Sequence, residues 1–477
     1  NDPNAQKVEK PAITPVPANR EAQSEFYKTV MAMNTPELTP VFVDYKKDIT
    51  ELSLKNNIPL LYHRNTENGL FELFYILDMG TNHDPKIGLA VNYLKYLGTD
   101  KYSAEQLQQE FYKLGCTFTV FSSQDQVYVS LRGLDENFNQ GLALFESFLA
   151  NAKPDKKALN DLVDGILKER ADAKLSKQVI LSQALVNYAK HGPKNPFTNI
   201  IPEKELKKVK PEELVNIIKS IPAYQHRVLY YGPRPATEMV TALNEGHKVP
   251  ATLKQTPAEK AFPELDIKQT KVYWVDYNMV QAEIIFLTKA NVFDKSLVPT
   301  ARLYNEYFGG GMGSIVFQEL RESKALAYSV NSRFNNASRK DRSNYIMSYI
   351  GTQSDKLPEA MVGMQHLLNE MPVAEANFDN AKASIRNTLA TERITKSAVL
   401  FDYERAKKLG LDYDIRKDIY NNLNITTFED IKKFQNTYVK EKPQAILVIG
   451  SKDRLNFNEL KKYGKVEELK LKEIFGY

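Results

Sequence analysis

The sequence predicts an α+β protein of two tandem homologous repeats, each a mostly antiparallel sheet with helices packed on one face. Two observations lead to this prediction. A strand that ends in a glycine occurs twice, as Val228–Tyr231 before Gly232 and as Ile446–Ile449 before Gly450. The segments that precede these strands also match in type and order, at a nearly constant offset along the chain. A repeated supersecondary unit accounts for such a pattern.

The matching elements follow the same order in both copies. A helix predicted from Pro211 corresponds to one predicted from Phe428, where Thr426 and Glu429 have the spacing of a capping box. Further upstream, each copy has a hairpin of alternating apolar and polar residues, two long amphipathic helices and one further helix. The hairpins are Thr117–Ser122 with Val127–Leu131 and Tyr328–Phe334 with Tyr345–Ile350; the helices are Asn137–Leu149, Lys157–Lys174 and Leu181–Lys190, and then Lys356–Glu370, Asn377–Arg393 and Ala398–Lys408. Because alternating strands bury one face only, the helices are expected to cover one side of each sheet.

The predicted domain boundaries follow from these repeats. Residues 43–233 form the first repeat and residues 271–477 the second. Residues 1–42 are polar and rich in proline, which is typical of a linker. Residues 234–270 carry several prolines and no sustained strand pattern in their later part, so they are expected to link the repeats. Because the chain begins with Asn1 and shows no signal peptide, a processed mature chain or a piece of a longer one is expected.

The composition narrows the class of protein. The chain has 477 residues, a net charge of +5, 42% apolar and 10% aromatic residues, which suit sizeable buried cores rather than disorder. Lysines and arginines alternate with acids along the predicted helices, and no basic stripe with interleaved aromatics occurs, so nucleic-acid binding is not expected. No apolar run approaches the ~18 residues of a membrane span, so a soluble chain is expected.

The residues that would drive hydrolysis are missing from the sequence. Zinc hydrolases use closely spaced histidines and a carboxylate, but no two histidines here lie within five residues of each other. The six histidines are expected to lie at the surface or to bury all but a polar tip. A site assembled from distant histidines stays an open alternative. The histidines are His63, His83, His191, His226, His247 and His366. Cys116 follows Gly115, which is predicted to end a helix in the left-handed region, so its thiol is expected to be packed. No metal site and no cofactor is predicted in this chain.

The most distinctive stretch is residues 307–330, YFGGGMGSIVFQELRESKALAYSV. It lacks the Gly-Lys-Ser/Thr ending of a phosphate loop. Its glycines are expected to end a helix and to let the backbone approach a neighbour closely. Ser314 is then placed to cap a short helix. Arg321, near the end of that helix, and Tyr328, at the start of the next strand, are expected to converge at one edge of the sheet.

This stretch resembles the second repeat of the zinc metallopeptidases related to pitrilysin, insulysin and the mitochondrial processing peptidase, an inverzincin family. The family pattern is Gly-Gly-Gly-Met-x-Ser-Arg-Leu-Phe-x-x-Leu-Arg-Glu-x-x-x-Leu-x-Tyr. The chain departs from it at Ile315 and Val316, where the family has Arg-Leu. The matching residues are Gly309, Gly310, Gly311, Met312, Ser314, Phe317, Leu320, Arg321, Glu322, Leu326 and Tyr328. The tandem repeat extends the resemblance over about residues 43–456.

In the first repeat, Gly88–Ser103 resembles the zinc helix of this family. Active members carry His-x-x-Glu-His after Gly-Leu-Ala, whereas this chain has Val91, Asn92, Tyr93, Leu94 and Lys95 there. Glu169 lies on the long helix that would supply the third ligand, and without the histidines it is expected to be a surface carboxylate. The resemblance therefore implies a half without a zinc site.

In such families two homologous halves close like a clamshell over a peptide. One half carries zinc, and the other contributes an arginine and a tyrosine. The resemblance places Arg321 and Tyr328 in that role, as donors to the peptide carbonyl that becomes an oxyanion, with Gly310, Gly311 and Ser314 binding substrate beside them.

The chain is therefore expected to be the non-catalytic, substrate-clamping half of a zinc metalloendopeptidase, inactive alone. The implied partners are a peptide and a zinc-carrying half, in the same precursor or a separate chain. An exported, periplasm-like location is implied by the resemblance only. The alternative is an inactive homologue that acts as a structural or protein-binding subunit, and the retained Arg321 and Tyr328 argue against it.

Overall fold

The computed structural model describes residues 24–34 and 38–477. The chain divides into two compact units, residues 1–39 and residues 40–477. The first unit contains one described helix, α1 (Glu25–Met31), whose N-cap Ser24 accepts a hydrogen bond from Tyr27 N. Much of the predicted linker over residues 1–42 lies outside the described residues, and the domain boundaries stay a prediction.

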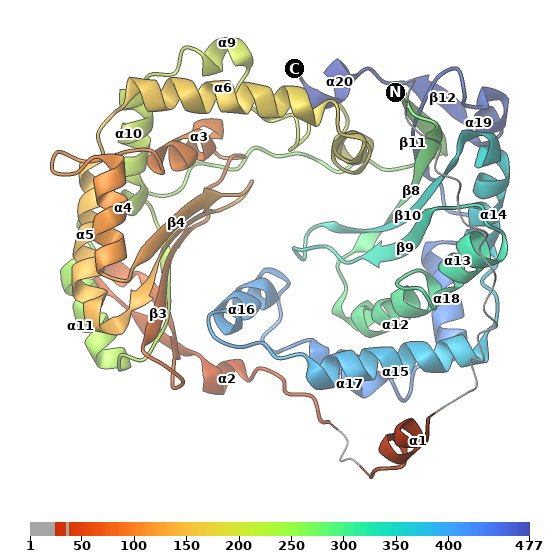
Figure 1. Cartoon of the computed structure of the whole chain (residues 1–477), viewed down its shortest axis with the longest axis horizontal. Helices are drawn as coiled ribbons and strands as arrows, with labels where there is room; N and C mark the ends of the chain where they lie inside the picture. The colour runs from red at the N-terminus through yellow and green to blue at the C-terminus, as the bar shows by residue number, and fades with distance from the viewer. Residues whose placement is uncertain (1–23, 35–37) are drawn as a thin grey trace, which may run out of the picture. The chain divides into compact units, whose positions relative to one another are not determined.

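Residues 40–477 contain two six-stranded sheets of corresponding topology (Figure 1). The first has the order β1-β2-β6-β3-β5-β4 and the second the order β12-β7-β11-β8-β10-β9. Their strands are β1 (Thr50–Ser53), β2 (Pro59–Arg64), β3 (Leu70–Leu77), β4 (Thr117–Ser122), β5 (Val127–Leu134) and β6 (Arg227–Gly232), and β7 (Lys271–Asp276), β8 (Gln281–Val292), β9 (Ser329–Asn335), β10 (Ser343–Gln353), β11 (Ala445–Gly450) and β12 (Lys465–Glu468). Most pairs are antiparallel; β2 with β6, and β7 with β11 and β12, are parallel. The predicted two-repeat α+β fold is confirmed.

One face of each sheet is covered by helices of its own repeat. In the first repeat these are α3 (Pro85–Leu94), α4 (Ala104–Lys113), α5 (Phe138–Asn151), α6 (Lys156–Ala173), α10 (Pro211–Ser220) and α11 (Ala236–Gly246). In the second they are α12 (Val298–Phe308), α14 (Leu357–Asn369), α15 (Glu375–Thr391), α17 (Arg416–Asn422), α18 (Phe428–Tyr438) and α19 (Phe457–Tyr463). Helix α11 lies within the segment expected to be a linker, and its Met239 and Leu243 are buried in the first core. Among the described residues, no helix is both long enough and apolar enough to span a bilayer.

The opposite face of each sheet is covered by a helix of the other repeat. Helix α16 (Ala398–Lys408) buries Val399 and Leu400 against Phe74 of the first sheet. In return, the π-helical turn η3 (Ile180–Leu185) and α8 (Val186–His191) pack on Leu447 of the second sheet. The sequence predicts these helices but not the exchange. Because of it, the two repeats share two cores and form one compact unit.

Two helix ends test the local predictions. Gly115 has a φ of 59° and ends α4, as predicted, and Cys116 beside it is buried at 2% exposure. The capping box of α18 was predicted one residue too early: Thr427, not Thr426, accepts from Asp430 N at 3.3 Å. The hydroxyl of Thr426 donates instead to the carbonyl of Asn422 at 2.8 Å. The Thr426 hydroxyl is therefore bonded to the preceding turn and does not cap α18, as the prediction required.

Candidate functional site

Helix α3 occupies the place that resembles the family's zinc helix. Asp84 caps it by accepting from Lys86 N at 2.8 Å. Val91 and Leu94 are fully buried in the first core, and the exposed Lys95 donates to Asn92 Oδ1 at 3.4 Å. Two apolar side chains and a cation thus stand where active members carry His, Glu and His. Neither valine, leucine nor a protonated lysine is a zinc ligand.

Glu169 of α6 lines a cleft of about 820 Å³ together with Asn92, Lys95 and Gln108. Glu105, Asp155 and Asp161 also line this cleft, but no histidine or cysteine of the described residues lines it. Across the described residues 24–34 and 38–477, no group of three or more His, Cys, Asp or Glu side chains could hold a metal ion. The donor set of this half therefore does not fit zinc, and no chemistry is assigned to a metal bound to it.

The glycine-rich turn lies against the first strand of the second hairpin. A Cβ on Gly309 would lie 2.3 Å from Ser332 O, so only glycine allows this close approach. Gly310 and Gly311 are exposed. Ser314 stands at the N-cap position of α13 (Ile315–Phe317), but its Oγ donates to Gly311 O at 2.6 Å instead of accepting from the helix. The predicted capping role of its hydroxyl is therefore wrong, because the hydroxyl faces back into the turn.

Arg321 lies in the π-helical turn η6 (Gln318–Ser323). Single π-turns inside helices often mark functional sites. The guanidinium lies 4.7 Å over the ring of Phe317, and its one ion pair among the described residues is a 3.8 Å contact with Glu322, its chain neighbour. The side chain is 45% exposed. Such an exposed pair contributes little to stability. The charge of Arg321 is thus left largely available.

Tyr328 leads into β9, where its backbone N–H donates to Gly351 O at 2.9 Å. Its side chain is 54% exposed, and its hydroxyl accepts from Gln353 Nε2 at 2.5 Å. Ala325, between Arg321 and Tyr328, has a φ of 49°, which is unfavourable for a residue with a Cβ. Within the described part of the chain, no hydrogen bond or ion pair joins Arg321 to Tyr328. Their convergence stays a prediction.

A buried polar cluster of the first repeat was not predicted. His226 and His247 are 7% and 1% exposed, and their Nε2 atoms lie 2.8 Å apart. Nδ1 of His247 lies 2.7 Å from Glu146 Oε1, which also accepts from the Tyr75 hydroxyl at 2.7 Å. Burial lowers the pKa of His226 to about 4. The expectation that each histidine lies at the surface or buries all but a polar tip is wrong for this pair. Their partners are distant in sequence, so their spacing carries no signal.

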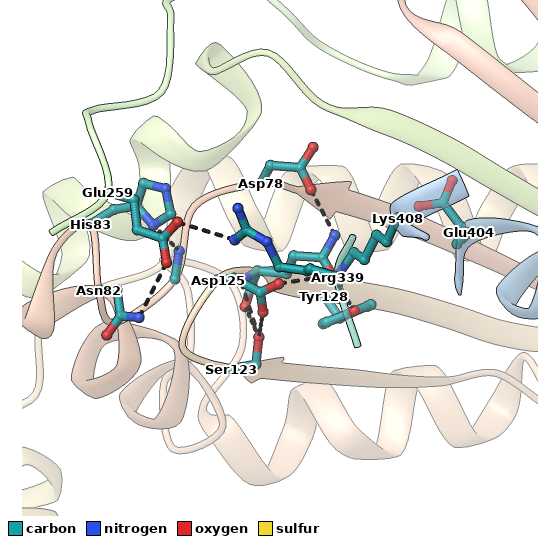
Figure 2. Close-up of polar contacts among 12 residues, drawn as sticks. Asp78, Asn82, His83, Ser123, Asp125, Tyr128, Glu259, Arg339, Glu404 and Lys408 are labelled. Carbon is teal, nitrogen blue, oxygen red and sulfur yellow. Dashed lines mark hydrogen bonds and ion pairs between the residues drawn. The ribbon is translucent and has the colours of Figure 1, made fainter. Parts of the chain in front are cut away.

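A polar network joins α16 to the first repeat, and Figure 2 shows Asp78, Asp125, Glu404 and Lys408 within it. Lys408 donates to Asp125 Oδ2 at 3.1 Å and to Gln126 Oε1 at 2.7 Å. Arg227, at the start of β6, donates to Asp78 Oδ2 at 2.9 Å and through Nε to Glu404 Oε2 at 2.7 Å. These contacts fix the exchanged helix on the first sheet.

Two family models match the chain. The model described as Insulinase (Peptidase family M16) matches residues 77–196, and the model described as Peptidase M16 inactive domain matches residues 208–385. An uncharacterized zinc protease from Rickettsia bellii is 22% identical over 392 residues, covering 78% of this chain and 88% of the relative.

Two solved structures share the fold. The peptidase M16 inactive domain from Pseudomonas fluorescens has a TM-score of 0.66 at 17% identity, covering 86% of this chain and 99% of that one. The periplasmic protease PqqL from Escherichia coli has a TM-score of 0.68 at 13% identity, covering 91% of this chain and 51% of that one. The two family models cover parts of both repeats, and the glycine-rich Arg–Tyr stretch lies inside the second match. The chain therefore belongs to peptidase family M16, the insulinase family, as the resemblance predicted.

Proposed function

We propose that this chain is the non-catalytic, substrate-clamping half of a zinc-dependent metalloendopeptidase, with zinc supplied by a homologous partner half. One contrast supports the proposal most strongly. Val91 and Leu94 of α3 are part of the core, whereas Arg321 and Tyr328 are exposed, Arg321 with a 3.8 Å ion pair to Glu322 and Tyr328 with a hydroxyl that accepts from Gln353. Exposed polar side chains such as these contribute little to stability, so they are available to a ligand at the surface.

The chemistry of the pair suits a peptide carbonyl that gains negative charge. The Tyr328 hydroxyl accepts from Gln353 Nε2, so its own hydrogen is free to donate to a substrate. The Arg321 guanidinium carries five N–H donors and has one long ion pair. Donors aimed at a developing oxyanion stabilise the transition state more than the ground state. The exposed backbone of Gly310 and Gly311, beside Ser314, would let an extended peptide lie close to them.

The partner and the location are part of the same proposal. The chain matches about half the length of PqqL, which suggests a larger assembly of two such halves. The zinc half would be in the same precursor or in a separate chain. PqqL is a periplasmic protease, and an exported location of this chain is proposed on that similarity.

The test is a peptidase assay of the chain mixed with a homologous half that carries His-x-x-Glu-His from the same organism. Neither half alone is expected to cleave peptides, and the mixture is expected to do so. Arg321→Ala and Tyr328→Phe should each lower kcat about a hundredfold, the ~3 kcal/mol typical of one oxyanion donor. The double variant should lose less than the two single losses combined, because both donors serve one oxygen.

Matched controls are Arg454→Ala and Tyr112→Phe, which alter exposed residues of the same types outside this stretch. Both should keep wild-type turnover. If Arg321→Ala and Tyr328→Phe also keep it in an active mixture, the clamping role fails, and a structural or protein-binding subunit becomes the better description. Chelator-sensitive cleavage by this chain alone would contradict the proposal directly.

A further inference from the structure

A polar cleft of about 440 Å³ lies between elements of the two repeats. Its walls come from α8, from the segment 259–264 and from the turn between β9 and β10, with Asn82 and Asp125 on the side of the first sheet. Figure 2 shows Asn82, Asp125, Glu259 and Arg339 of this region. Its volume lies within the range of roughly 300–1,000 Å³ that is common for small-molecule sites. None of its lining residues belongs to residues 307–330, so the cleft is separate from the proposed clamp.

Some of the charged groups in the cleft are already neutralised within the protein. Arg339 pairs with Glu259 at 3.3 Å across the cleft wall and with Asp341 at 3.2 Å. Asp125 pairs with Lys408 of α16 at 3.1 Å. Glu259 also accepts from Asn82 Nδ2 at 3.3 Å. These groups shape the cleft but leave little charge for a ligand.

Two cations on the cleft wall are not neutralised in this way. Within the described residues, Lys190 and Arg342 form no ion pair, and Glu264 is the one lining carboxylate that also forms none. Nη1 of Arg342 donates to Phe262 O at 3.3 Å. Lys190 Nζ lies 4.0 Å from the centre of the Tyr345 ring, and burial lowers its pKa. Among the described lining groups without an ion pair there are thus two cations and one carboxylate.

The same wall offers an unused hydrogen-bond donor and apolar surface. Tyr345 is 4% exposed, and its hydroxyl has no hydrogen-bond partner among the residues that the structure describes. An unsatisfied buried hydroxyl is costly and is usually explained by a missing partner. Phe262 and Val186, which also line the cleft, are nearly as buried as Tyr345 and supply an apolar wall.

We propose that this cleft binds a small organic carboxylate, either a free amino-acid-sized acid or the C-terminal residue of a peptide, with its carboxylate beside Lys190 and Arg342. A carboxylate brings one negative charge to Lys190 and Arg342, which form no ion pair among the described residues, together with an apolar body that fits Phe262 and Val186. A phosphate monoester would bring up to two charges and no such body. The acceptor oxygens would also satisfy the Tyr345 hydroxyl.

Isothermal titration calorimetry of the full chain tests the proposal with three probes: acetyl-Ala-Phe as the free acid, the same dipeptide as the C-terminal amide, and acetylphenylalanine. The free acid should bind at least about tenfold more tightly than the amide, because charge-assisted hydrogen bonds are lost in the amide. Lys190→Met and Tyr345→Phe should each weaken binding of the acid by about tenfold or more. Acetylphenylalanine separates the two sources: equal affinity indicates a free acid, and binding of the dipeptide acid alone indicates a peptide C-terminus.

The matched control is Lys407→Met, since Lys407 also stacks on a tyrosine, with Nζ 4.9 Å from the centre of the Tyr403 ring, outside the cleft. It should bind the acid like the wild type. Thermal unfolding of each variant checks that it folds, and Tyr345→Phe keeps the ring on which Lys190 lies. Equal affinity for acid and amide, unchanged binding by Lys190→Met, or no binding of any probe at millimolar concentration would overturn the proposal.

Discussion

His226 and His247 form a buried hydrogen-bonded chain whose donors and acceptors can be assigned. Nδ1 of His226 lies 2.7 Å from Tyr224 O, so it must carry a hydrogen, and Nε2 of the neutral ring then accepts from His247. Nδ1 of His247 lies 2.7 Å from Glu146 Oε1, which extends the chain to the Glu146 side chain. A second proton on His226 would set two N–H groups against each other.

The first prediction at this scale is a loss of stability in acid. In the folded protein the pKa of His226 is lowered, chiefly by burial, from 6.5 to about 4. Between these values the unfolded chain binds a proton that the folded chain does not, so stability falls as the pH falls from 6.5 towards 4. At pH ~4 the loss amounts to ~3 kcal/mol of unfolding free energy.

Urea unfolding of the wild type and His226→Gln between about pH 7 and about pH 4 measures this loss. The variant should show a smaller loss than the wild type. His366→Gln, which alters a histidine at 53% side-chain exposure, should lose as much as the wild type. An unchanged pH dependence in His226→Gln would show that other groups are responsible.

At the scale of elements, sequence patterns predicted the helix and strand bounds that interactions between nearby residues determine. The hairpin strand Thr117–Ser122 and the helix Ala398–Lys408 have the predicted bounds. The same sequence places Arg321 near a helix end and Tyr328 beside a strand start, because capping, periodicity and turn residues act over a few positions. Which sheet a helix covers depends on contacts hundreds of residues apart, so the exchange of α16 and α8 could not be predicted. The His226–His247 pair and the Lys190 cleft were missed for the same reason.

Leu400 of α16 is the residue whose substitution tests how much the exchanged helix stabilises the first sheet. It is fully buried against the first sheet, although it belongs to the second repeat. Leu400→Ala should lower the free energy of unfolding by about 2–5 kcal/mol, because it removes packed methyl groups and leaves a cavity. Hydrogen–deuterium exchange should rise in β3 and β6 of the first sheet before it rises in β8 and β10. Lys407→Ala, about two helical turns away and exposed, should change neither quantity measurably. Faster exchange confined to the second sheet would contradict the assignment of α16 to the first.

At the scale of the whole molecule, residues 40–477 combine two similar repeats through shared cores. Separate repeats of this size would be expected to unfold independently, since multidomain chains usually depart from two-state behaviour. Here, however, the unfolding of one repeat uncovers a face of the other repeat's sheet. The first sheet would lose its contact with α16, and the second sheet would lose its contact with η3 and α8. Unfolding either repeat therefore exposes apolar surface on both. The exchange makes cooperative unfolding of the two repeats the expected behaviour.

The single tryptophan tests this cooperativity, because Trp274 lies in β7 of the second repeat and is 4% exposed. Ile218 of α10 and Ile431 of α18 are fully buried on corresponding helices of the two repeats, so Ile218→Val and Ile431→Val form a matched pair. Each should cost about 0.5–1.5 kcal/mol. If the repeats unfold together, both variants shift the urea midpoint of Trp274 fluorescence by similar amounts, and circular dichroism gives the same midpoint. If Ile218→Val shifts only the circular dichroism and leaves the fluorescence midpoint in place, the repeats unfold separately, and the exchanged helices contribute less to coupling than their burial indicates.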